Sequence, residues 1–263
     1  ITIPNTVTSI GDEAFSGCYG LTSITIPDSV TSIGSDAFTD CGSLKSITIS
    51  NSVKEIGEYL FEDCTSLESI TIPKNVTSLS SSIFNGCTNL KSIIIPDNVT
   101  SIGDFAFNYC ISLTDIEIPD GVTSIGEGAF CNCALLDELE IPDSVTDIGP
   151  GAFYDCTSLT NVTIGDGVKT IGEQAFFGCN ALEGITVSEG NTAYSSDEYG
   201  ILFNKDKTEL LQYPARNQTK DYILPDSVIK IGTGALSGCS SLESITVPEK
   251  NTAYATDEYG VLY

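Results

Sequence analysis

The chain has 263 residues, and its 36 acidic against 11 basic residues give a formal net charge of −25. This charge excludes nucleic acid and anionic membrane surfaces as partners, because both are bound through Lys and Arg contacts to phosphate. Histidine is absent, which excludes Ser-His-Asp and Cys-His catalysis as well as imidazole metal ligands.

One sequence unit recurs along the chain at a fixed spacing. Its cysteines stand 23 residues apart from Cys18 to Cys179, and the series resumes at Cys239. Through Cys179, a Phe stands three residues before each of these cysteines and a Leu three residues after it. A period of roughly 20 to 29 residues with an L-x-x-L-x-L core is typical of a leucine-rich-repeat solenoid. No single unit buries its apolar residues alone, so stacked neighbours are expected to share one core.

Within a unit, residues 24–26 alternate between Ile and Thr, which predicts a strand with one buried face. Pro27 ends this strand, because it cannot donate a ladder hydrogen bond. Residues 30–34 predict a second short extended segment and a turn. Residues 35–38, Ser-Asp-Ala-Phe, predict one short helical turn. Successive strands are expected to pair in parallel, about 4.8 Å apart.

The repeat is interrupted once, because 60 residues rather than 23 separate Cys179 from Cys239. Gly-Ile-Leu-Phe and Thr-Glu-Leu-Leu-Gln-Tyr flank the turn-rich Asn-Lys-Asp-Lys, a pattern that predicts a β-hairpin. Residues 191–203 recur in similar form as residues 251–263. We expect one continuous solenoid domain with three parts. Residues 1–188 form a regular part of about eight coils, and residues 189–224 form an inserted hairpin island. Residues 225–263 contain the resumed repeat and the start of a second island. Both ends cut a repeat, so we expect a fragment of a longer chain.

The predicted fold is α/β and β-rich: a right-handed leucine-rich-repeat solenoid with 23-residue coils, a parallel strand face, short helical turns and a β-hairpin insertion. The unit C-x-S-L-x-S-I-x-I-P-x-S-V-x-S-I-G-x-x-A-F resembles the BspA-type leucine-rich repeat over nearly the whole chain. This resemblance implies an extracellular or cell-surface protein of gut or oral bacteria or of some protozoa. It also implies adhesion to host proteins or to other cells.

The cysteines are predicted to be free, buried thiols rather than disulfides. Their Cβ vectors on adjacent coils are expected to run in parallel into the core, which suits a small buried hydrophobe. No C-x-x-C pair is present, so no zinc site is expected. Cys131 lies outside the 23-residue series, and the sequence leaves open whether it is exposed or forms a local pair.

The outward strand positions form columns of Ser and Thr, which β-propensity and solubility explain. Two neighbouring coils depart from this pattern and carry carboxylates beside one outward apolar residue. The candidate ligand-binding residues here are Ile94, Asp115, Glu117, Asp137, Glu138 and Glu140. Three interpretations stay open: a solvated acidic stripe, a docking surface for a basic protein segment, and a Ca²⁺ site.

Seven of the eleven tyrosines and the single arginine lie beyond residue 190. Tyr and Arg are enriched at interface hot spots, so the island adds the candidates Tyr194, Tyr199, Tyr213 and Arg216. The alternative is a structural role, in which these residues cover a place where the coil widens.

Two functions remain open at this point. The first is a non-catalytic module that binds an extracellular or cell-surface protein or glycoprotein. The second is a structural spacer of a surface protein with no specific ligand. Neither requires a cofactor or a catalytic residue, neither inserts into a membrane, and the oligomeric state is left open.

Overall fold

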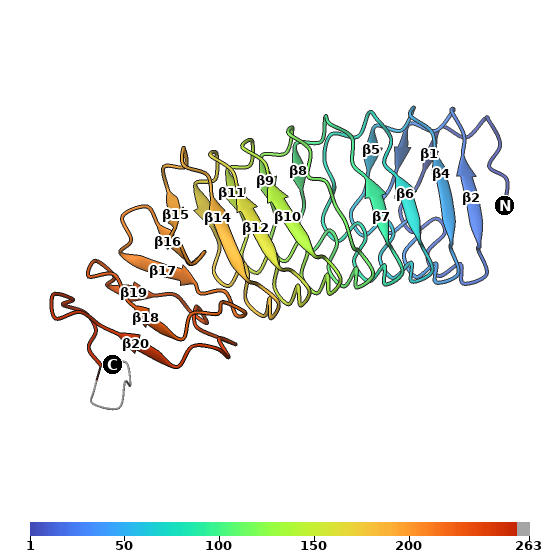
Figure 1. Ribbon diagram of the computed structural model, residues 1–263. Helices are drawn as coiled ribbons and strands as arrows, with labels where there is room; N and C mark the ends of the chain where they lie inside the picture. The colour runs from blue at the N-terminus through green and yellow to red at the C-terminus, as the bar shows by residue number, and fades with distance from the viewer. Residues whose placement is uncertain (257–263) are drawn as a thin grey trace.

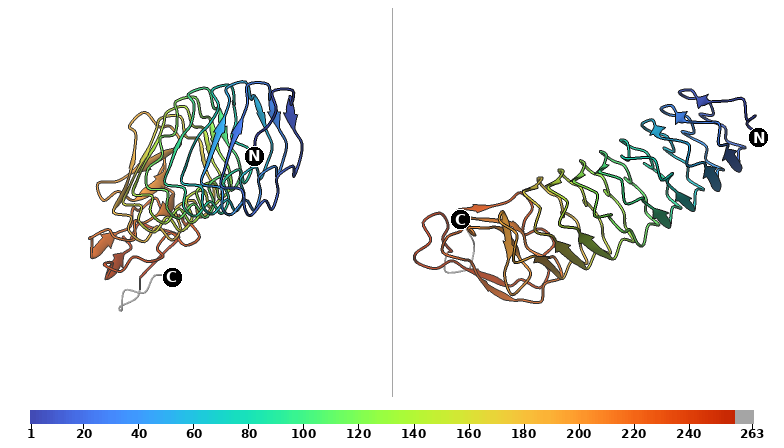
Figure 2. Two further views of the ribbon diagram at one scale, coloured as in Figure 1. Left: turned by 90° about the vertical axis from the view of Figure 1, so that its right-hand side faces the viewer. Right: turned by 90° about the horizontal axis from the view of Figure 1, so that it is seen from above.

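The computed structural model describes residues 1–256, which form an elongated stack of coils (Figure 1). Two rows of strands run along the stack on two of its sides (Figure 2). The coils from the N-terminus to β14 follow one gently curved path, and the strands after β14 bend away from it (Figure 1). The fold is thus the predicted solenoid of 23-residue coils, since successive strands are offset by that number of residues.

The first row contains the longer strands, whose alternate residues are buried and exposed as predicted. In β2, for example, Ile24 and Ile26 are buried while Ser23 and Thr25 are exposed. Neighbouring strands of the row pair in parallel where they pair at all, as in β2–β4, β6–β7 and β10–β12–β14. The row consists of β2 (Ser23–Ile26), β4 (Ser46–Ile49), β6 (Ser69–Thr71), β7 (Ser92–Ile94), β10 (Glu138–Ile141), β12 (Asn161–Ile164) and β14 (Gly184–Val187).

The second row contains two-residue strands that also pair in parallel, in the orders β1–β3–β5 and β8–β9–β11–β13. Each of them ends in an Ile whose side chain points into the stack, buried or half-buried. They are β1 (Ser9–Ile10), β3 (Ser32–Ile33), β5 (Glu55–Ile56), β8 (Ser101–Ile102), β9 (Ser124–Ile125), β11 (Asp147–Ile148) and β13 (Thr170–Ile171).

The core runs along the axis of the stack as columns of one residue type. The eight Phe rings from Phe15 to Phe176 stack in sequence, with centroids of successive rings 5.1 to 5.7 Å apart. The Leu column beside it is fully buried at most positions. Every coil therefore buries its apolar residues against the coils on either side, which is why a single repeat has no core of its own.

The predicted short helical turns are wrong, because residues 1–256 contain no helix at all. In residues 34–41, Asp36 and Asp40 have φ angles of 57° and 61°, a left-handed conformation that no α-helix tolerates. The N–H groups of Asp36, Phe38 and Asp40 donate to carbonyls of the next coil at 2.9 to 3.1 Å. The residues between them form tight turns, with bonds such as Thr39 N–H to the Asp36 carbonyl at 3.2 Å. Hydrogen bonds between coils thus replace those within a helix. With no helix present, none of the described residues belongs to a membrane-spanning helix.

All ten cysteines are free thiols in the described part of the chain, and most of the repeat series is fully buried. From Cys41 to Cys179, each Sγ donates to the carbonyl of the Phe 26 residues earlier, at 3.1 to 3.2 Å. Burial raises the pKa of these thiols, to about 11 for Cys41 and about 12 for Cys179. Cys131 is half-buried and accepts a hydrogen bond from the amide of Asn132 at 3.1 Å.

The interruption of the repeat is a widened coil followed by a normal one. Tyr213 occupies the position of the repeat Phe, since its N–H donates to the Ala235 carbonyl at 2.8 Å and its carbonyl accepts from Cys239. The coil from Phe176 to Tyr213 therefore holds 37 residues, and the next coil, to Leu236, holds 23. The regular repeat resumes at Tyr213, before the boundary predicted at residue 224.

The widened coil contains the predicted hairpin, formed by β16 and β17, and a third antiparallel strand, β15. β17 then takes the place of a two-residue strand and pairs in parallel with β19, while β18 pairs with β20. These strands are β15 (Tyr194–Ser196), β16 (Leu202–Asn204), β17 (Glu209–Gln212), β18 (Asp221–Ile223), β19 (Lys230–Ile231) and β20 (Ser244–Thr246).

Two Asn-Thr-Ala-Tyr segments make equivalent contacts 60 residues apart. The Asn191 side chain donates to the carbonyls of Gly165 and Val168 at 2.8 and 3.0 Å, and Asn251 donates to the carbonyl of Val228 at 2.8 Å. The recurring segment thus anchors a coil to the preceding one. Of the predicted second island, residues 257–263 lie outside the described residues.

Candidate functional site

The predicted acidic cluster lies where the ladder of the first strand row is interrupted. Residues 115–118 form no strand, and neither β7 nor β10 pairs with them. Asp115 stands one coil before Glu138, and Glu117 one coil before Glu140, at the 23-residue offset that places residues opposite each other. Like charges opposite each other destabilise a sheet, which disfavours pairing with β10; β7, on the other side, carries no carboxylate. A second interruption, between β4 and β6, has only Ser and Thr at its outward positions, and charge does not explain it.

A hollow of about 750 Å³ lies over the interrupted ladder. Four of the five predicted carboxylates line it: Asp115, Glu117, Glu138 and Glu140. Asp120, which the sequence analysis did not single out, lines it as well. Asp137 is exposed but lies outside the hollow, where its carboxylate accepts a hydrogen bond from the Thr160 hydroxyl at 3.3 Å. The Thr and Asn side chains of β12 border the hollow on the other side.

Ile94 is 65% exposed, as expected for an outward strand residue. It lines a different hollow of about 580 Å³, over β4, β6 and β7. The structure therefore does not join Ile94 with the carboxylates. Within residues 1–256, no group of three or more acidic or thiol side chains is placed to hold a metal ion, so the arrangement offers a polar, negatively charged surface rather than a Ca²⁺ cage.

The aromatic residues predicted for the island divide into buried and exposed ones. Tyr194 and Tyr213 are 9% and 1% exposed, so neither ring lies on the outer surface, although Tyr194 lines the junction cavity described below. The Tyr213 hydroxyl donates to the Thr219 carbonyl at 3.4 Å, and burial raises its pKa to about 12. Tyr199 is 43% exposed and packs edge-on against Tyr222, with ring centroids 6.0 Å apart.

Arg216 is exposed, and it occupies the cysteine position of its coil. Its backbone N–H donates to the Leu182 carbonyl at 2.8 Å, which ties the widened coil to the Leu column. Tyr199 and Arg216 are therefore the two predicted island residues that reach the surface.

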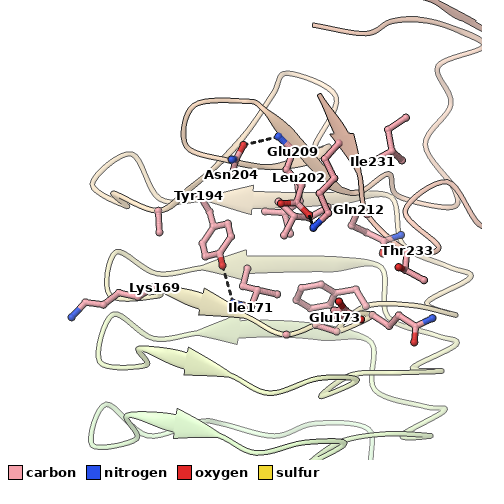
Figure 3. Close-up of a pocket in the computed structure, with 18 residues that line it drawn as sticks. Lys169, Ile171, Glu173, Tyr194, Leu202, Asn204, Glu209, Gln212, Ile231 and Thr233 are labelled. Carbon is pink, nitrogen blue, oxygen red and sulfur yellow. Dashed lines mark hydrogen bonds and ion pairs between the residues drawn. The ribbon is translucent and has the colours of Figure 1, made fainter. Parts of the chain in front are cut away.

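The sequence analysis missed a cavity of about 380 Å³ at the junction of the regular coils and the widened coil. It lies between β13 on one side and β17 and β19 on the other (Figure 3). The hydroxyl of Tyr194 accepts a hydrogen bond from the N–H of Ile171 at 2.8 Å across its edge. An ion pair between Lys230 and Glu209, with nitrogen and oxygen 2.7 Å apart, borders the opening.

The lining of this junction cavity mixes apolar and polar side chains, and one of the polar ones is buried. The apolar walls come from Phe176, Leu202 and Ile231 among others. Gln212 is only 8% exposed and also lines the cavity. The one feature of the sequence that could have indicated this cavity was the break in the cysteine spacing.

The similarity of this chain to known proteins lies in its repeat. A family model described as BspA type leucine rich repeat region matches residues 1–113, 77–200 and 213–258. A leucine rich cell surface protein from Faecalibacterium prausnitzii is 34% identical, with a TM-score of 0.66 over 95% of this chain and 61% of that chain. A leucine-rich repeat protein from Bacteroides ovatus is 31% identical, with a TM-score of 0.64 over 92% of this chain and 64% of that chain.

The pneumococcal vaccine antigen PcpA, at 24% identity and a TM-score of 0.52 over 95% of this chain and 55% of that chain, shares the fold alone. This chain spans less than two thirds of the length of all three solved chains. No curated protein matches it in sequence. The family match covers most of the chain and follows the same repeat as the structure. The chain belongs to the BspA-type leucine-rich repeat family.

Proposed function

We propose that this chain is a non-catalytic protein-interaction module of an extracellular or cell-surface protein, and that it adheres to host proteins or to other cells. The description of the F. prausnitzii relative as a cell surface protein supports the location. The exposed strand face supports the interaction, because a row of parallel strands from many coils gives one broad, rigid surface.

The observation that carries the proposal is the carboxylate hollow over the interrupted ladder, lined by Asp115, Glu117, Glu138 and Glu140. Placing like charges opposite each other costs stability, whereas the Ser and Thr columns of the other coils avoid this cost. A basic segment of a partner protein or glycoprotein would neutralise the four carboxylates. Such binding depends on charge, so it is expected to weaken as salt screens the surface.

The test is the binding of the purified chain to immobilised fibronectin, fibrinogen and mucin at about 20 mM and about 150 mM salt, where the Debye length falls from roughly 20 to 8 Å. One variant changes the four carboxylates of the hollow to Ser or Thr, the residues of the other columns. A matched control changes four exposed glutamates outside the hollow to Gln: Glu13, Glu55, Glu58 and Glu127.

Saturable binding that is lost in the hollow variant and kept in the matched control supports the proposal. Equal loss in both variants shows a response to net charge alone and contradicts the role of the hollow. No saturable binding by any form favours the alternative function, a structural spacer with no specific ligand. Circular dichroism of each variant shows that it is folded.

A further inference from the structure

Backbone hydrogen bonds link the turn segments of successive coils in a regular way. In each of seven coils, three alternate N–H groups donate to carbonyls of the next coil, as Gly151, Phe153 and Asp155 do at 2.8 to 2.9 Å. The middle donor is always the repeat Phe. In the eighth coil the equivalent donors are the N–H groups of Gln174, Phe176 and Gly178, and none of the three has a partner among residues 1–256.

The missing partners follow from the widened coil that comes next. Four residues separate Ile148 from Phe153, but only two separate the equivalent Leu210 from Tyr213. The segment whose carbonyls would accept the three bonds is therefore too short to lie along the eighth coil. Unpaired backbone donors are rare in folded proteins, because each forfeits a hydrogen bond.

Two of these donors, Gln174 and Phe176, belong to the lining of the junction cavity. Gln174 has a φ angle of 58°, within the range of the donors that are paired in the other coils. The edge is thus already in the conformation that binds a neighbouring segment.

The cavity also presents acceptors. The Ile171 carbonyl has no partner among residues 1–256, whereas the equivalent Ile148 carbonyl accepts from Gly172 at 2.8 Å. The Gln212 amide donates through Nε2 to the Tyr213 carbonyl at 3.0 Å, and its Oε1 has no partner in the described part of the chain. Donors and acceptors on one edge suit a peptide backbone, which carries both, better than an anion, which accepts only.

We propose that the junction cavity binds an extended peptide segment of a partner protein, whose carbonyls accept from Gln174 and Phe176 and whose small apolar side chain enters the cavity. The mode is strand addition, in which backbone bonds supply affinity and a pocket supplies selectivity. The small residue follows from the precedent in the fold, where the carbonyl that accepts from Phe153 of the seventh coil belongs to Ala175. A cavity of about 380 Å³ suits a side chain of this kind and its neighbours. This site lies away from the carboxylate hollow and shares no residue with it.

The probe is a synthetic peptide with the sequence of residues 147–155, Asp-Ile-Gly-Pro-Gly-Ala-Phe-Tyr-Asp, whose carbonyls accept bonds of this type within the chain. The whole ¹⁵N-labelled chain is titrated with it and followed by NMR. A scrambled peptide and acetate serve as controls. We expect saturable shifts of the Gln174 and Phe176 amide signals with the probe, and at least about tenfold weaker binding of either control.

Two variants fill the cavity with a larger side chain. Ala193→Phe does so from the half-buried wall, and Thr233→Phe from the exposed rim, where folding is least affected. Each is expected to weaken binding of the probe by about tenfold or more. The matched control is Ala253→Phe, the equivalent position of the second Asn-Thr-Ala-Tyr segment, which lies outside the cavity.

Saturable shifts at both amides that either folded cavity variant abolishes, and that Ala253→Phe leaves unchanged, support the proposal. The proposal is overturned if the probe produces no saturable shift at about 1 mM, if acetate or the scrambled peptide binds equally well, or if the folded cavity variants bind like the parent chain. Each of these results leaves the test of the carboxylate hollow unaffected, because the two tests change different residues.

Discussion

Asn191→Ala removes the side chain that anchors the widened coil to the regular stack. Asn191 is 1% exposed, and its Nδ2 donates to the carbonyls of Gly165 and Val168. Its Oδ1 accepts from the N–H groups of Ala193 and Tyr194 at 2.9 and 2.8 Å. At about 1 kcal/mol net for each hydrogen bond, the four bonds contribute about 4 kcal/mol. We expect the free energy of unfolding to fall by about this amount, since alanine leaves all four backbone partners unpaired.

Urea unfolding followed by far-UV circular dichroism measures this change through linear extrapolation. Because repeat arrays unfold in stages, hydrogen exchange of the Ile171 amide follows the junction directly. Asn251→Ala is the matched control, because Asn251 makes the same kinds of bonds but is only half-buried. A smaller loss of about 1–2 kcal/mol is expected there. A loss below about 1 kcal/mol for Asn191→Ala, or equal losses at both positions, would refute the anchoring role.

Three further changes test the core, the thiols and the acidic surface. Phe107→Ala deletes a fully buried ring stacked between two others, and we expect it to lower the free energy of unfolding in urea by about 3–5 kcal/mol. The control, Phe105→Ala, removes a partly exposed ring and is expected to lower it by less than about 1 kcal/mol. Similar losses at the two positions would contradict the stacked core. Burial raises the pKa of the Cys41 thiol from 9.0 to about 11. Above pH 9 the unfolded chain binds fewer protons than the folded one, so the urea midpoint is expected to hold steady from pH 7 to 8 and to fall between pH 9 and 11. A midpoint that stays flat over this range would count against buried thiols. Glu117→Gln with Glu140→Gln removes one like-charge pair and is expected to raise the free energy of unfolding by about 0.2–1 kcal/mol at low salt; a gain that persists unchanged at 1 M salt would rule out a charge effect.

The candidate surface was partly predictable from the sequence. The 23-residue offset alone placed Asp115 opposite Glu138 and Glu117 opposite Glu140, because residues one repeat apart lie side by side in a solenoid. The same reasoning could not separate Ile94 from these carboxylates, since the break in the ladder between their coils is not a property of any one repeat. The enrichment of Tyr at interfaces suggested Tyr194 and Tyr213 as binding residues and left a structural role in the widened coil open; both rings pack inside that coil.

The sequence by itself determined the period, the strands and the core. The Phe, Cys and Leu positions recur at the same offset, and the alternation of Ile with Ser or Thr assigned the buried face of each strand, because burial of apolar residues follows periodicity. Hydrogen bonds between coils decided the rest. They replaced the short helical turns predicted at residues 35–38 by left-handed turns bonded to the next coil. The N–H groups of Gln174 and Phe176 have no partner among residues 1–256, because the segment one coil away is too short to reach them, and only the stacked structure brings the two segments together.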